Sequence, residues 1–152
     1  MEVLPLYLDG SVVTLALLGG LTIQIGWHAE VHPSEIACNV AEEFAFRPIV
    51  AHSTSWRHEP GKLIVTYATL VEPPPSLPPM LRAHAIGRAE LARGSALRAP
   101  KVIDVDQVVE HALRHFSWLS RDDEHVRAAL PEPWVRALAA YPPEPFRTFE
   151  GE

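Results

Sequence analysis

Three oxygen-bearing side chains recur within residues 33–45 at a spacing that suits a hard metal ion. Asn39, Glu42 and Glu43 stand at i, i+3 and i+4, so a helix presents all three on one face. Adjacent carboxylates repel each other, and a divalent cation commonly offsets that repulsion. Oxygen ligands favour Mg²⁺ or Mn²⁺, which complete their coordination with water and substrate phosphates. The alternative is a solvated helix face, where glutamates are common.

A second group precedes this helix. His28, Glu30 and His32 alternate along a segment that we expect to be extended, so they would share one strand face. Such a set could bind Zn²⁺ or another transition metal, or supply a base near Glu42 and Glu43. The alternative is a half-exposed strand with ordinary polar side chains.

The order of residues 33–46 resembles the helical half of the Nudix box, the signature of the Nudix hydrolase superfamily. Glu42 and Glu43 fall on the paired metal-binding glutamates, and Val40 and Phe46 fall on two apolar positions. The resemblance covers roughly residues 15–73. It implies an α/β/α sandwich with a mixed β-sheet, a Mg²⁺ or Mn²⁺ cofactor and a diphosphate-linked substrate. Glu42 and Glu43 would be the catalytic residues, with Asn39 and Glu35 as further ligands.

The sequence also departs from the Nudix box. Cys38 stands where the family has arginine, Asn39 where it has the first glutamate of the trio, and Ala45 where it has glycine. An asparagine offers a neutral carbonyl oxygen, but it cannot accept a proton as a general base. The missing arginine removes a partner that orients the glutamates. These changes weaken hydrolysis by the family mechanism.

The hydrophobic pattern predicts one α/β domain over residues 1–152, with a core at about 1–100 and a helical extension at about 104–141. Asp9-Gly10 is a hairpin signal between the first two strands. A near capping box, Asp104 with Gln107, opens a C-terminal helix, and Ser120 is expected to cap the next one. The expected strands are residues 2–8, 11–18, 21–31, 48–56 and 62–71, and the expected helices are 33–45, 105–116, 121–130 and 133–141. Residues 81–91 fit either a strand or a helix, and we favour a strand.

Composition narrows the classes of partner. The chain has 152 residues and a net charge of −6, without a basic stripe, so we expect no binding to a nucleic-acid backbone. The longest apolar stretch, residues 11–25, is interrupted by polar residues and glycines, so we expect no membrane span. A single cysteine, Cys38, and the lack of a signal-peptide pattern favour a cytoplasmic protein.

Two functions stay open at this stage. The first is a metal-dependent Nudix-type hydrolase of a nucleoside-diphosphate-linked substrate, with weakened or lost activity. The second is a non-catalytic Nudix-like module that binds a ligand, regulates or mediates protein interaction. The expected partner is a phosphate-bearing small molecule, and the C-terminal helices could form a homodimer contact.

Overall fold

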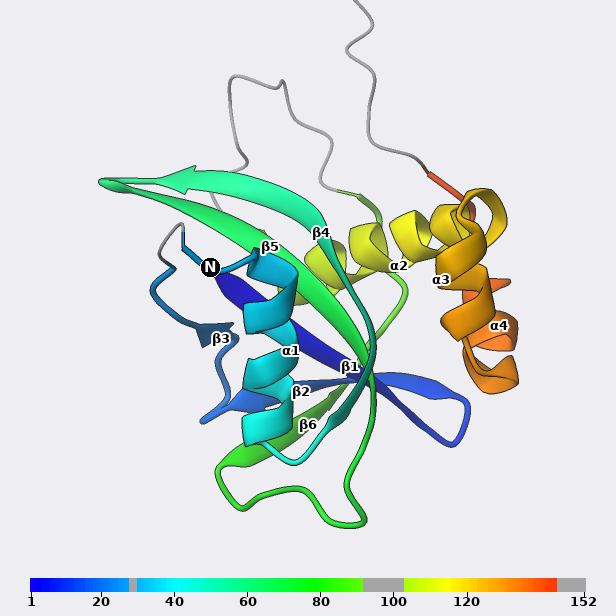
Figure 1. The fold of residues 1–152 in the computed structure, drawn as a ribbon, viewed down its shortest axis with the longest axis horizontal. Coiled ribbons are helices and arrows are strands. Elements are labelled where there is room, and N and C mark those ends of the chain that lie inside the picture. The colour runs from blue at the N-terminus through cyan, green and yellow to red at the C-terminus, as the bar shows by residue number, and fades with distance from the viewer. Residues whose placement is uncertain (28–29, 92–102, 145–152) are drawn as a thin grey trace, which may run out of the picture.

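The structure is a computed structural model that describes residues 1–27, 30–91 and 103–144. It is an α/β fold with a six-stranded mixed sheet in the order β4-β5-β1-β2-β6, and β3 pairs with β1 (Figure 1). The strands are β1 (Glu2–Asp9), β2 (Val12–Leu18), β3 (Ile23–Gln24), β4 (Arg47–Glu59), β5 (Lys62–Glu72) and β6 (Leu81–Ala85). The helices are α1 (Pro33–Glu43), α2 (Val105–Asp122), α3 (Glu124–Ala129) and α4 (Glu132–Leu138).

Strand β1 is the interior strand that ties the sheet together. It pairs with β2 antiparallel through the predicted turn at Asp9-Gly10, where Gly10 has a φ of 60°. On its other side it pairs with β5 in parallel, with Glu2 opposite Thr66. Strands β4 and β5 form a long antiparallel hairpin whose free end projects beyond the rest of the sheet (Figure 1).

Helix α2 covers one face of the sheet. Its first turn has a complete capping box, since the Asp104 side chain accepts from the backbone and Gln107 bonds back to the Asp104 N–H, as the sequence predicts. Its apolar stripe, including Leu113 and Phe116, packs against Leu4 and Leu6 of β1 in the largest buried cluster. Helices α3 and α4 add Val126, Leu130, Trp134 and Leu138 to the same cluster.

Helix α1 covers the opposite face of the sheet. Pro33 lies in its first turn, where the missing N–H costs nothing, and His32 is the N-cap. Its buried residues are Ala37, Val40 and Ala41, which lie against residues of β1 and β5. The helix ends at Phe44, and Ala45 follows with a φ of 63°, a left-handed conformation that favours glycine.

Several expected boundaries were wrong. Of the extended segment expected at 21–31, the structure has a strand at Ile23–Gln24 and an isolated bridge between Leu21 and Leu18. Ser120 does not cap a helix, because its hydroxyl bonds the Ser117 carbonyl within α2, and the cap of α3 is Asp123 instead. The strand expected at 48–56 runs from Arg47 to Glu59, and that expected at 81–91 ends at Ala85. The loop expected at 94–100 lies outside the described residues.

None of the described helices is both long enough and apolar enough to cross a bilayer.

Candidate functional site

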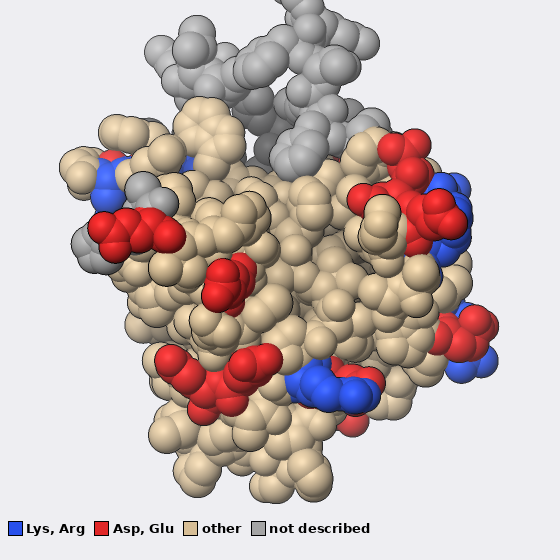
Figure 2. Space-filling view, in the orientation of Figure 1, with Lys and Arg blue, Asp and Glu red and all other residues tan. Residues whose placement is uncertain are grey.

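The predicted metal-binding residues lie on the solvent side of α1. Asn39, Glu42 and Glu43 are all exposed, as expected for three residues on one helix face. Acidic side chains are scattered over this face of the molecule, with one basic group beside the lowest acidic group and others at the left and right edges (Figure 2). Within the described residues, no group of three or more His, Cys, Asp or Glu side chains is arranged to hold a metal ion. Two exposed carboxylates and a neutral amide do not make a complete set, so we derive no reaction step through a metal.

Two members of the second predicted group, Glu30 and His32, lie in the connection between β3 and α1, and His28 lies outside the described residues. His32 is the N-cap of α1, with Nδ1 2.6 Å from the Ser34 hydroxyl and 3.3 Å from the Ser34 backbone nitrogen. Glu30 and His32 therefore do not belong to a strand. Glu35, in the first turn of α1, is exposed.

Cys38 occupies the position where the Nudix box has arginine. The thiol is half-buried beside the sheet. Burial raises the pKa of this thiol, and the charge of Glu42 raises it further. Cys38 therefore stays neutral at physiological pH and cannot orient the glutamates as a cation would.

A different polar group spans the sheet on its α2 face. Glu2, the first residue of β1, is 3% exposed and accepts four hydrogen bonds. Two come from Arg57 of β4, at 2.7 and 3.0 Å. The others come from the hydroxyls of Thr22 and Thr66, both at 2.8 Å. Thr22, Glu2, Thr66 and Arg57 thus form a continuous polar row across neighbouring segments of the sheet, which we call the polar row.

Electrostatics hold this row in its ionised form. Burial raises the pKa of Glu2, but the hydrogen bonds from Arg57, Thr22 and Thr66 outweigh burial and keep the pKa below its ordinary value. The hydrogen bond with Glu2 raises the pKa of Arg57. Each Glu2 oxygen accepts two hydrogen bonds, which fills its usual capacity, so Glu2 is unsuited to act as a base.

The polar row meets a pocket of about 460 Å³. One wall is apolar and is formed by Leu4 of β1 together with Ile103, Val105 and Val108. A second hollow, of about 230 Å³, continues past Arg57 toward the side of Trp56. Of the five N–H groups of Arg57, four have acceptors in Glu2, Glu59 and Thr66, and one on Nη2 has none among the described residues. The pocket therefore combines one apolar wall with a polar lining that includes Arg57.

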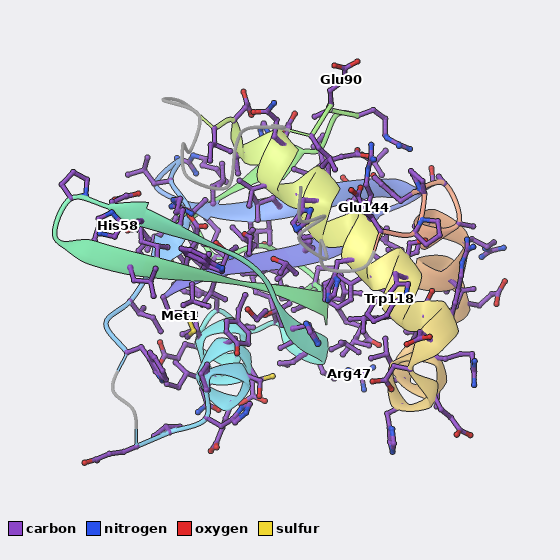
Figure 3. All side chains as sticks on the ribbon, turned by 90° about the horizontal axis from the view of Figure 1, so that it is seen from above. Met1, Arg47, His58, Glu90, Trp118 and Glu144 are labelled. Carbon is purple, nitrogen blue, oxygen red and sulfur yellow. The ribbon has the colours of Figure 1, made fainter. Side chains whose placement is uncertain are left out.

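The pocket and the α1 acids lie on opposite faces of the sheet. Val105 and Val108 of α2 line the pocket, whereas Glu42 and Glu43 belong to α1. Helices α1 and α2 lie on different sides of the strands, with His58 marking the free end of the hairpin near the pocket (Figure 3). A small molecule in this pocket has the sheet between itself and those glutamates.

The sequence analysis missed Glu2 and Arg57 as a pair. They are 55 positions apart, and their contact depends on the order β4-β5-β1. One signal was present, because Glu2 shares the strand face of Leu4 and Leu6 and is therefore a charged residue at a core-facing position. A buried charge of this kind requires a partner.

Comparison with models of known protein families finds no family that matches this chain, and comparison with curated proteins finds no match either.

Proposed function

We propose that this chain is a non-hydrolytic, Nudix-like ligand-binding domain whose ligand occupies the pocket over the polar row. The observation that carries the proposal is the Glu2–Arg57 pair, which lines a pocket of about 460 Å³ opposite an apolar wall. Pockets with apolar walls and a few fixed polar groups are typical of small-molecule sites.

The charges around the pocket indicate the chemistry of the ligand. Arg57 is paired with Glu2 and Glu59, so its positive charge is largely neutralised. A doubly charged phosphate would gain little there and would meet the Glu59 carboxylate. The preferred ligand has an apolar or aromatic body and an uncharged acceptor, such as a carbonyl oxygen, for the remaining N–H of Arg57. An uncharged nucleoside is a representative probe of this class.

Hydrolysis at Glu42 and Glu43 is the competing prediction from the Nudix resemblance. It requires a metal ion on the α1 side and a substrate whose diphosphate reaches it. The exposure of both glutamates and the neutral Asn39 favour binding without turnover.

The test compares binding and turnover in the same protein. Thermal shift is measured with uncharged nucleosides, and phosphate release is measured with nucleoside-diphosphate compounds in Mg²⁺ or Mn²⁺. We expect nucleosides to raise the melting temperature of the wild type and of Glu43→Gln equally, without phosphate release. Val108→Trp, which fills the pocket, should abolish the shift, whereas the matched substitution Val135→Trp on exposed α4 should not.

Two outcomes would overturn the proposal. Phosphate release that disappears in Glu43→Gln would establish the hydrolase. A nucleoside shift that survives Val108→Trp, or no shift with any nucleoside, would remove the pocket as the binding site.

A further inference from the structure

A second apolar hollow lies on the other face of the sheet, at the N-terminal end of α1. Its volume is about 420 Å³, and its apolar lining includes Ile25, Trp27, Leu63 and Val65. Two cationic groups also line it: Lys62, which pairs with Glu59, and the N-terminal ammonium of Met1, which donates to the Ile25 carbonyl. Trp27 is 43% exposed and Leu63 is 59% exposed, so both present apolar surface to solvent. The Trp27 indole donates to the Val31 carbonyl at 3.1 Å, which fixes the ring in place. The hollow is thus preformed, and it is large enough to accept an apolar side chain from a partner.

The surface that continues from this hollow along α1 is acidic. No Lys or Arg occurs before Arg47 in the sequence. Glu30 and Glu35 flank Pro33, and Glu42 and Glu43 lie about two turns farther along the helix. None of the four forms an ion pair with a residue that the structure describes, although Figure 2 shows a basic group beside the lowest acidic group on this face.

The end of α1 strengthens this negative field. A helix C-terminus carries partial negative charge, and basic side chains there are favourable. The last turn of α1 holds Glu42 and Glu43 and no basic residue. Both carboxylates therefore interact unfavourably with the negative end of the helix dipole, and a cationic side chain of a partner would reduce this repulsion.

We propose that the Trp27–Leu63 hollow and the acidic face of α1 together bind a basic segment of a partner protein that carries one apolar anchor residue. Charge complementarity selects this occupant. Phosphate backbones and anionic lipid surfaces are repelled by four unpaired carboxylates. A free metal ion would make no use of the apolar hollow, whereas an apolar side chain with Lys or Arg on the following turns uses both features.

The dimensions agree with a helical segment as the occupant. Glu35 and Glu42 are seven residues apart on α1, which corresponds to about 10 Å along the helix axis. Basic residues about two turns apart on a partner helix match this separation. The anchor residue would precede them and enter the hollow beside Pro33.

The test uses a synthetic helical peptide of about 16 residues, with one leucine followed by lysines on one face. Matched peptides replace the lysines with glutamates or the leucine with serine. Affinity is measured by calorimetry with the full chain at low and high salt. We expect only the leucine–lysine peptide to bind, and its affinity to fall as salt rises.

Variants of the exposed residues locate the site. Glu42→Gln with Glu43→Gln should weaken binding about five- to tenfold, and Leu63→Ser should weaken it about fivefold. The control, Glu124→Gln with Glu132→Gln on α3 and α4, removes the same charge elsewhere and should leave the affinity unchanged. Thermal melts establish that each variant is folded.

Three results would overturn this inference. They are equal binding of the lysine and glutamate peptides, equal losses in the α1 and control variants, or no binding of the leucine–lysine peptide. The nucleoside shift is a separate readout, because Glu42→Gln with Glu43→Gln leaves the pocket over the polar row intact. Failure of one proposal is therefore distinguishable from failure of the other.

Discussion

His115 makes the stability of this protein dependent on pH. The side chain is 1% exposed, and its Nε2 lies 3.3 Å from Nδ1 of His52 where α2 packs on β4. Burial, together with the neighbouring His52 and His111, lowers the pKa of His115 from 6.5 to about 4, although the backbone of Glu144 opposes the change. The folded protein therefore holds His115 neutral at pH values where the unfolded chain is protonated.

The sign and size of the effect follow from linkage. Below pH 6.5 His115 becomes protonated in the unfolded state, whereas in the folded state it stays neutral until about pH 4. The free energy of unfolding therefore decreases as the pH falls between these values, and the loss is complete below the lower one. At about 1.4 kcal/mol for each pH unit, the loss attributable to His115 is about 3 kcal/mol.

Urea denaturation at a series of pH values between neutral and pH 4 measures this loss. His115→Gln removes the titrating group, so its unfolding free energy should depend less on pH than that of the wild type. His58→Gln, at the exposed end of the hairpin, is the matched control and should behave as the wild type does. An NMR titration of the His115 ring gives its pKa directly, and a midpoint near the ordinary value would refute the reasoning even if the variant were unstable.

Three further predictions concern stability, each measured by urea denaturation against the wild type. Ala45→Gly should stabilise the protein by about 0.5–1 kcal/mol, because the φ of 63° at Ala45 suits glycine; a loss of stability would contradict this. Glu110→Gln should destabilise it by about 2 kcal/mol, because Glu110 is fully buried between Arg88 and Arg114; an unchanged midpoint would show that the pair adds nothing. Asp104→Ala should cost about 1 kcal/mol through loss of the capping box, and Asp104→Ser should restore most of it.

Local signals in the sequence predicted the elements that depend on neighbouring residues. Asp9-Gly10 marked the first hairpin, Pro33 the start of α1, and Asp104 with Gln107 the start of α2. Ser120 misled because a serine within a helix can bond back to the preceding turn as well as cap a new helix. The capping signal at Ser120 competes with burial of the apolar face of α2. The helix continues past Ser120 because this apolar face extends to Leu119.

Features that depend on distant residues were not predicted. The parallel pairing of β1 with β5 places Glu2 beside Thr66 and within reach of Arg57, and no local pattern encodes that order. The spacing of Asn39, Glu42 and Glu43 correctly indicated a shared helix face. It could not indicate that the pocket over the polar row lies on the other side of the sheet, because spacing along one helix carries no information about what faces it.

The parallel pair of β1 and β5 also constrains how this chain acquires its structure. Glu2 and its neighbour Thr66 are 64 positions apart, so a ribosome working at about 5–20 residues per second needs several seconds to deliver the second strand after the first. During that interval the edge of β1 that pairs with β5 in the folded sheet has unpaired backbone groups. We expect the nascent chain to be prone to aggregation in this period. Substitutions that slow the pairing of β5 with β1 should therefore reduce soluble yield more than they reduce the free energy of unfolding of the folded protein.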